Sequence, residues 1–200
     1  MQKNSFTGAR NIDLVRIFAY NRYMKKRTAK KERKKSNPHL LRTLLTALCV
    51  ALLAFIFGNS AMPADESAAQ SDFVTDLVQK ILKVFAPNSW AANATGADYE
   101  RLHSIMRTLA HFSEFALLGA LLVFTFRSYT RNFYAFVVCV CLIILIPILD
   151  ETLQAFTSGR VADVADLYVD TLGGVIGGLF ATMAVCIVGG IIRKKRKTTV

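Results

Sequence analysis

The stretch "FYAFVVCVCLIILIPIL", Phe133–Leu149, contains no charged residue and is long enough to cross a membrane as a helix. Three further apolar blocks, residues 40–58, 109–126 and 172–192, hold at most two ionisable side chains each. A helix needs roughly 20 apolar residues to cross ~30 Å of hydrocarbon, with about 17 as a lower bound. Only helices and closed barrels satisfy their own backbone groups there. The sequence therefore predicts an all-α integral membrane protein, a bundle of four transmembrane helices.

The charge of the chain is unevenly distributed. The net charge is +11, from 25 Lys and Arg against 14 Asp and Glu. Such a basic chain could bind nucleic acid, but 13 of the cations lie in residues 1–42, 2 in residues 127–132 and 5 in residues 193–200. Four spans put these three segments on one side, and the positive-inside rule makes that side the cytoplasm. We therefore expect cytoplasmic N- and C-termini and no nucleic-acid partner.

This pattern divides the chain into three parts: a basic cytoplasmic segment (1–39), a four-span membrane domain (40–192) and a basic cytoplasmic tail (193–200). The first segment could bind anionic lipid, at about 1 kcal/mol per cation near the surface, although a simple topology anchor is favoured. Between the first two spans, residues 58–71 are small, polar and turn-prone. Residues 72–85 carry an apolar stripe of period 3.6, which predicts a short amphipathic helix on the outer face.

Polar side chains gather at the outer ends of the other three spans. In the second span, steps of four and three residues place Arg107, His111 and Glu114 on one helix face. An ionisable group near the bilayer centre costs ~2.5–3.5 kcal/mol, so exposure of these groups to lipid is disfavoured. The candidate outer-leaflet polar site comprises Arg107, His111, Glu114, Asp150, Glu151, Gln154, Arg160, Asp166 and Asp170.

Each of these residues also has a structural interpretation. Glu114 could pair with His111 and fix the helix register, and one of Asp150 and Glu151 could be a solvated helix end. As a set, the residues could hold a headgroup, relay protons or bind a divalent cation through carboxylates and His111. The chain has no metal-ligand motif, so we assign no metal site; catalytic residues and cofactors stay unknown. The four cysteines lie in the spans and are interpreted as packing residues.

The fourth span carries glycines at helical spacing. Gly173 and Gly177 form a small-xxx-small face, which usually packs against another helix. Asp166 and Asp170 continue this face toward the outer side and should point into the bundle.

Three blocks together resemble the signature of the VanZ-like family: "RTLAHFSEF" (107–115), "DETLQAFTSGR" (150–160) and "DLYVDTLGGVIG" (166–177). The resemblance covers roughly residues 40–192. It implies a bacterial cell-membrane protein with four or more spans, in a family whose name-giving member is associated with resistance to the glycopeptide teicoplanin. The family brings no settled biochemical activity.

Two functions follow as hypotheses. The first is a protein that acts on or binds an envelope lipid or wall precursor at the outer leaflet, with Arg107 and Arg160 holding an anionic group. The second is a non-catalytic scaffold or sensor that binds partner proteins through the Gly173/Gly177 seam or the basic N-terminal segment. A transporter ranks last, since four spans are few. Whether the chain catalyses a reaction stays open, as does assembly into a homo-oligomer.

Overall fold

The computed structural model of this chain describes residues 20–24, 38–130 and 132–197. The chain divides into two units, residues 1–41 and residues 42–200. In the first unit, residues 20–24 form a helical turn. Most of the basic N-terminal segment, for which anionic-lipid binding was the alternative to a simple topology anchor, lies outside the described residues.

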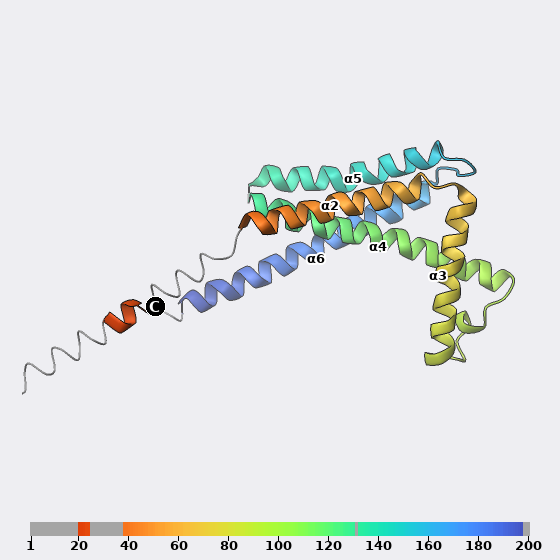
Figure 1. Ribbon diagram of the computed structural model, residues 1–200, viewed down its shortest axis with the longest axis horizontal. Helices are drawn as coiled ribbons and strands as arrows, with labels where there is room; N and C mark the ends of the chain where they lie inside the picture. Colours follow the sequence, from red (N-terminus) through yellow and green to blue (C-terminus); the bar gives the residue numbers. More distant parts are fainter. Residues whose placement is uncertain (1–19, 25–37, 131, 198–200) are drawn as a thin grey trace, which may run out of the picture. The chain divides into compact units, whose positions relative to one another are not determined.

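The described part of the chain is helical and contains no strand. Figure 1 shows the elements: α2 (Pro38–Ser60), α3 (Ala64–Phe85), the 3-10 turn η1 (Ala91–Asn93), α4 (Ala97–Tyr129), α5 (Phe133–Ala155) and α6 (Val164–Lys197). Four of the helices, α2, α4, α5 and α6, are long and apolar enough to cross a membrane. The predicted fold class, an all-α membrane protein with four spans, is confirmed.

Two of these helices extend well beyond the predicted apolar blocks. The second block, residues 109–126, lies inside α4, which begins at Ala97, and the fourth, residues 172–192, lies inside α6, which begins at Val164. Arg107 and Asp166 are therefore on regular helix rather than in loops, and their backbones have fixed positions relative to the bundle.

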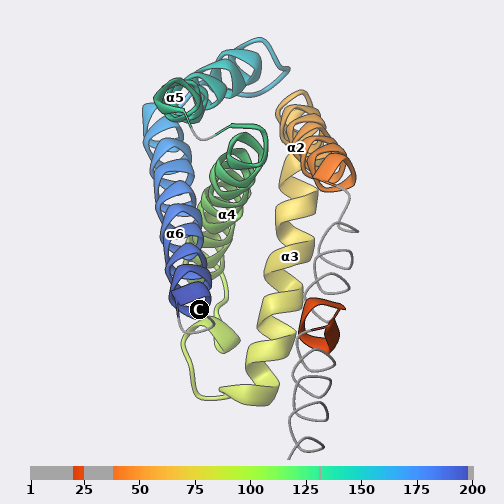
Figure 2. The ribbon, with the colours of Figure 1, turned by 90° about the vertical axis from the view of Figure 1, so that its left-hand side faces the viewer.

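Helix α3 is longer than the sequence pattern predicted. Residues 58–71 were interpreted as turn-prone, but the helix begins at Ala64. The sequence supports this start, since Pro63 precedes the helix, Asp65 and Glu66 lie in its first turn, and alanines follow. α3 runs across the direction of α4 and α6 (Figure 1), and Figure 2 shows it beside α4.

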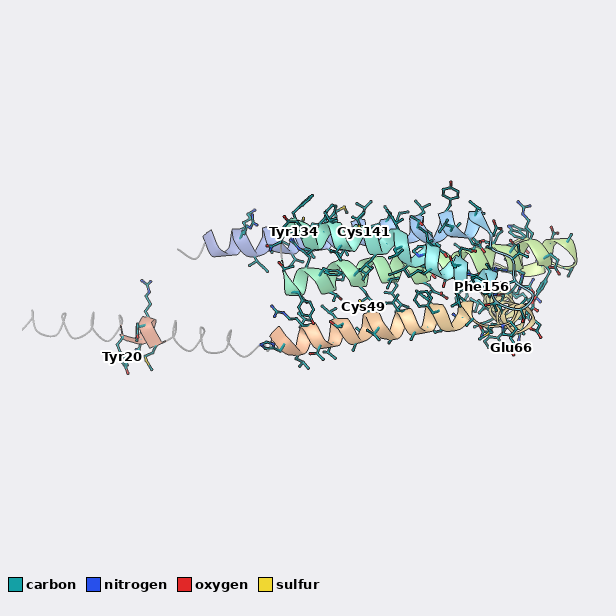
Figure 3. The ribbon with its side chains drawn as sticks, turned by 90° about the horizontal axis from the view of Figure 1, so that it is seen from above. Tyr20, Cys49, Glu66, Tyr134, Cys141 and Phe156 are labelled. Carbon is teal, nitrogen blue, oxygen red and sulfur yellow. The ribbon has the colours of Figure 1, made fainter. Side chains whose placement is uncertain are left out.

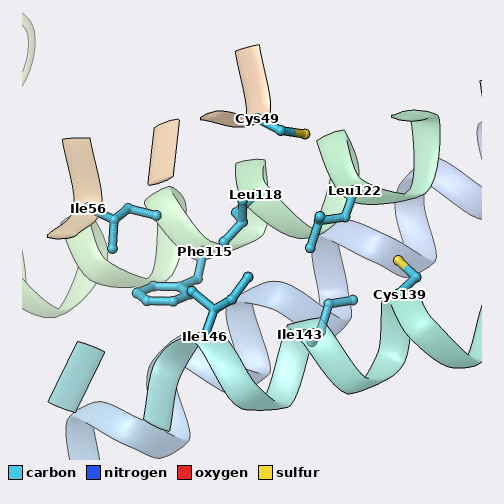
Figure 4. Packing of buried hydrophobic residues seen from close by; sticks show 8 residues of the cluster. All are labelled: Cys49, Ile56, Phe115, Leu118, Leu122, Cys139, Ile143 and Ile146. Carbon is cyan, nitrogen blue, oxygen red and sulfur yellow. The ribbon is translucent and has the colours of Figure 1, made fainter. Parts of the chain in front are cut away.

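The apolar core joins α2, α4 and α5 within the second unit. Figure 4 shows its buried residues: Cys49, Ile56, Phe115, Leu118, Leu122, Cys139, Ile143 and Ile146. Cys49 faces α4, with its Sγ 3.2 Å from Thr125 Oγ1, whereas Cys141 lies on the outer face of α5 (Figure 3). Cys186 is also exposed. The packing role expected of all four cysteines therefore fails for Cys141 and Cys186, which face outward.

Helices α4 and α6 run in the same direction with closely apposed backbones (Figure 1). A Cβ added at Gly173 would collide with the Phe112 carbonyl oxygen, and one at Gly177 with the Ala116 carbonyl oxygen. Glycine is therefore required at this seam by the distance between the helices. The seam also sets the register that brings the polar residues of α4 opposite those of α6.

The outward faces of the four long helices are apolar. Large hydrophobic side chains with more than half of their surface exposed include Leu44, Phe136, Leu179 and Phe180. Exposure on this scale is costly in water but favourable in hydrocarbon. The protein is thus a multi-pass membrane protein whose helices contact the lipid bilayer.

Candidate functional site

The C-terminal end of α5 is buried rather than solvated. Asp150, Glu151 and Gln154 are 0%, 6% and 1% exposed. Gln154 Nε2 donates to Asp150 Oδ2 at 2.9 Å, and Ser60 Oγ of α2 donates to Asp150 Oδ1 at 2.5 Å. Both oxygens of the Asp150 carboxylate are thereby oriented. Glu151 points elsewhere, and its Oε2 accepts the backbone N–H of Asp163 at 3.0 Å. Neither acid is a solvated helix end.

Two acid–base pairs connect α4 to α6 at the end of the bundle where α3 lies. Arg107 Nη2 donates to Asp166 Oδ2 at 3.3 Å, and His111 Nδ1 lies 3.4 Å from Asp170 Oδ1. Both pairs advance four residues along parallel helices, so they stack one turn apart. Arg107 is 43% exposed, whereas Asp170 is fully buried. The Arg107–Asp166 pair, here called the upper pair, is therefore open. The His111–Asp170 pair, the lower pair, is enclosed.

The lower pair lies next to Asp150. Ligand atoms of His111, Asp150 and Asp170 all lie within 4.8 Å of one another. Both carboxylate oxygens of Asp170, and Nδ1 of His111, lack a hydrogen-bond partner among the described residues. These three side chains come from three helices, and they are the residues that could hold a metal ion.

Two cavities open beside these pairs. The inner cavity has a volume of about 190 Å³. Its lining includes polar groups from four helices and from the loop between α5 and α6: Asn59, Ser60, Ser67, Gln70, Ser71, Arg107, His111, Glu114, Asp150 and Arg160. The outer cavity has a volume of about 370 Å³ and includes Asp163 and Asp166 in its wall. The two cavities share Ser67, Ser71, Arg107 and Arg160, so they are adjacent compartments of one polar site.

Arg160 occupies the boundary between the compartments. It is half-buried, and its Nη2 donates to Ser67 Oγ of α3. Burial, and then the positive charge of Arg107, lower the pKa of the Arg160 guanidinium from its ordinary value. A guanidinium still carries its charge at physiological pH. Arg107 and Arg160 lie in a shared cavity wall, close enough to repel each other. Binding of an anion beside them is therefore favourable.

The structure places six of the nine predicted site residues in the walls of the two cavities: Arg107, His111, Glu114, Asp150, Arg160 and Asp166. Of the other three, Asp170 is paired with His111, and Gln154 donates to Asp150. Glu151 is turned toward Asp163.

Sequence reasoning missed the hydroxyl groups of the site. Ser60 belongs to the segment that was interpreted as turn-prone, residues 58–71, yet its hydroxyl donates to Asp150. Ser67 and Ser71, four residues apart, line both cavities from one face of α3. Interpreting this segment as a turn hid that face, and recognising its helical start would have revealed it.

Comparison with known proteins places most of the chain in one family. The model of the VanZ/LLP1 family matches residues 45–186. Every residue of the candidate site lies inside this range. No curated protein and no solved structure matches the chain.

Proposed function

The chain belongs to the VanZ/LLP1 family, and from that premise we propose that it binds the phosphate-bearing headgroup of an envelope lipid or lipid-linked wall precursor. The site faces the outer leaflet of a bacterial cell membrane, since the basic loops and tail fall at the opposite ends of the helices. The observation that carries the proposal is the pair of arginines shared by two polar cavities at the end of a membrane bundle.

Arg160 is the principal headgroup ligand. Arg107 already donates to the Asp166 carboxylate, so part of its charge is balanced within the protein. Among the described residues, the hydrogen bond of the Arg160 guanidinium goes to a neutral hydroxyl, which leaves its other donors for a phosphate oxygen. The hydroxyls of Ser67 and Ser71 add neutral donors beside it.

The apolar part of the ligand has a route to the site. Phe55 and Val74 belong to the wall of the inner cavity, and both side chains are exposed on the outside of the protein. A lipid tail could therefore lie against α2 and α3 while its headgroup enters between them. Glu114 and His111, deeper in the same wall, would position the headgroup or exchange protons with it.

The scaffold alternative loses one of its two surfaces. Gly173 and Gly177 pack against Phe112 and Ala116 of the same chain, so this seam is not available to a partner protein. The other surface, the basic N-terminal segment, lies mostly outside the described residues.

The first test measures lipid retention. The full chain, purified in mild detergent, should carry a phosphate-bearing lipid that mass spectrometry detects, and Arg160→Gln should weaken binding of added phosphatidylglycerol. Hydrogen bonds to charged groups contribute about 1.5–3 kcal/mol, which is roughly a ten- to hundredfold change in affinity. Arg101→Gln is the matched control, because Arg101 lies on α4 outside both cavities, over the ring of Trp90.

Cells provide the second readout. If the lipid ligand underlies teicoplanin tolerance, Glu114→Gln and Arg160→Gln should both lower tolerance at unchanged protein level. Unchanged lipid content together with retained tolerance in these variants would contradict the proposal.

A further inference from the structure

One group in the site is not explained by headgroup binding. Asp170 is fully buried on α6, and neither of its carboxylate oxygens has a hydrogen-bond partner among the described residues. An isolated buried carboxylate is strongly unfavourable unless a cation or a proton compensates it. The basic group that faces it is the His111 ring, whose Nδ1 lies 3.4 Å away but outside hydrogen-bond geometry.

The charges around Asp170 do not balance. Asp150 brings a second buried carboxylate to within 4.8 Å of the same position, and Glu114 lines the cavity next to them. Arg107 is paired with Asp166, and Arg160, which donates to the neutral hydroxyl of Ser67, brings one positive charge to the cavity that Asp150 and Glu114 also line. A protonated His111 could neutralise one of the two aspartates but not both. The cluster therefore lacks positive charge within the part of the chain that the structure describes.

We propose that His111, Asp150 and Asp170 form a binding site for one divalent transition-metal ion. Two carboxylates and a neutral imidazole would balance a charge of +2. Two ligands that are each ~2.1 Å from an ion at the tetrahedral angle lie about 3.4 Å apart, which matches the separation between His111 Nδ1 and Asp170 Oδ1. The third ligand, Asp150, lies within 4.8 Å, a spacing that rotation of the His111 and Asp170 side chains can shorten.

The surroundings of Asp150 fit a metal ligand. Ser60 and Gln154 each donate to one of its oxygens, which fixes the orientation of the carboxylate and leaves further lone pairs available. Hydrogen bonds of this kind commonly orient the ligands of protein metal sites. The three ligands also come from α4, α5 and α6, so the backbone holds them on rigid elements.

The ligand set indicates the class of ion. Mg²⁺ and Ca²⁺ prefer oxygen ligands alone, whereas one imidazole with two carboxylates suits Zn²⁺ or Mn²⁺. His111 and Asp150 also line the inner cavity, so the ion would be accessible from the space next to Arg107 and Arg160. There it could polarise an oxygen of a bound anion.

The test uses the full chain in detergent, stripped with a chelator and without added lipid. Titration calorimetry with ZnCl₂ and MnCl₂, together with elemental analysis, should give one ion per chain. Asp170→Asn and His111→Ala should each weaken binding by at least about tenfold. The matched control is Glu151→Gln, which removes a neighbouring buried acid on α5 and should change binding by less than about threefold.

Thermal unfolding separates ligand loss from misfolding. In chelator, Asp170→Asn should melt no lower than the wild type, because it removes an unpartnered charge and keeps the side-chain shape. Added Zn²⁺ or Mn²⁺ should raise the melting temperature of the wild type and of Glu151→Gln, but not that of Asp170→Asn. A structural His111–Asp170 ion pair would instead make Asp170→Asn melt lower in chelator, which would overturn the proposal.

Other results would also overturn it: no ion bound at stoichiometry, Asp170→Asn binding as tightly as the wild type, or binding of Mg²⁺ as strong as that of Zn²⁺ and Mn²⁺. The inference stands apart from the proposed lipid function. Lipid retention that depends on Arg160 in a protein without an ion site would reject only the metal, and an ion site in a protein that retains no lipid would reject only the lipid.

Discussion

At the residue scale, Asp150 shows how a locally unfavourable side chain is accommodated. A carboxylate in the last turns of a helix opposes the helix dipole by about 0.3–1 kcal/mol, and Asp150 is also fully buried. Hydrogen bonds from Ser60 and Gln154 offset this cost, since bonds to charged groups are stronger than those between neutral groups. An acid held in this way is specified by its neighbours rather than by its own helix.

The contribution of Ser60 can be measured. Ser60→Ala removes the donor to Asp150 Oδ1 and should lower the free energy of unfolding in detergent by about 1–3 kcal/mol. Thr152→Ala on α5 is the control, because its exposed hydroxyl donates to the carbonyl of Ile148 in its own helix, and it should change stability by less than about 0.5 kcal/mol. Equal effects of the two substitutions would show that Ser60 does not support Asp150.

Residue contacts were the least predictable feature of the site. Helical spacing placed Arg107, His111 and Glu114 on one face of α4, and all three line the inner cavity. Spacing could not tell that Glu151 turns toward Asp163 while its neighbour Asp150 turns into the bundle. Consecutive residues on a helix differ by about 100° in direction, so the rotation of α5 within the bundle decides between them.

At the scale of elements, the seam between α4 and α6 aligns the site. Gly173 and Gly177 allow the two backbones to approach, and the same register carries Arg107 opposite Asp166 and His111 opposite Asp170. The positions of these ion pairs therefore depend on glycines that lie about one to three turns away from them.

The seam can be tested with alanine. Gly177→Ala places a Cβ against the Ala116 carbonyl oxygen, and overpacking of this kind costs about 1–3 kcal/mol. Gly190→Ala, on the same helix, meets nothing within 4 Å and should be neutral or stabilising by up to about 1 kcal/mol. Thermal unfolding in detergent compares the two variants. If Gly177→Ala were as stable as Gly190→Ala, α4 and α6 could move apart without loss of stability.

Helix α3 begins earlier than the local sequence pattern predicted. The apolar stripe in residues 72–85 predicted an amphipathic helix, yet the structure begins it at Ala64. Small polar residues suit both turns and helices, so composition favoured neither strongly. The added turns matter for function, because they carry Ser67 and Ser71 into the walls of both cavities.

At the scale of the whole molecule, the charge distribution predicts the orientation in the membrane. Of the 25 Lys and Arg, 20 lie in residues 1–42, 127–132 and 193–200, and the positive-inside rule places these in the cytoplasm. The candidate site is on the opposite side only if this topology is correct, so the proposed function requires it.

Cysteine labelling in cells tests the orientation. In a background where Cys49, Cys139, Cys141 and Cys186 are replaced by serine or alanine, Asn88→Cys should react with a membrane-impermeant maleimide in intact cells. Asn132→Cys should react only after the membrane is permeabilised. Both positions are exposed in the structure. The reverse pattern would place the site on the cytoplasmic side and contradict an outer-leaflet ligand.

The sequence by itself determined the number of long helices, their approximate positions and the resemblance to the VanZ-like family. Span length and apolarity are local properties, and a single long apolar segment satisfies its own backbone groups in hydrocarbon by forming a helix. Only the tertiary structure decided that His111, Asp150 and Asp170 converge, that Ser60 holds Asp150 and that two arginines share a cavity wall. These contacts depend on the rotation and register of whole helices, which packing at the glycine seam and in the core sets, and which spacing along one helix cannot specify.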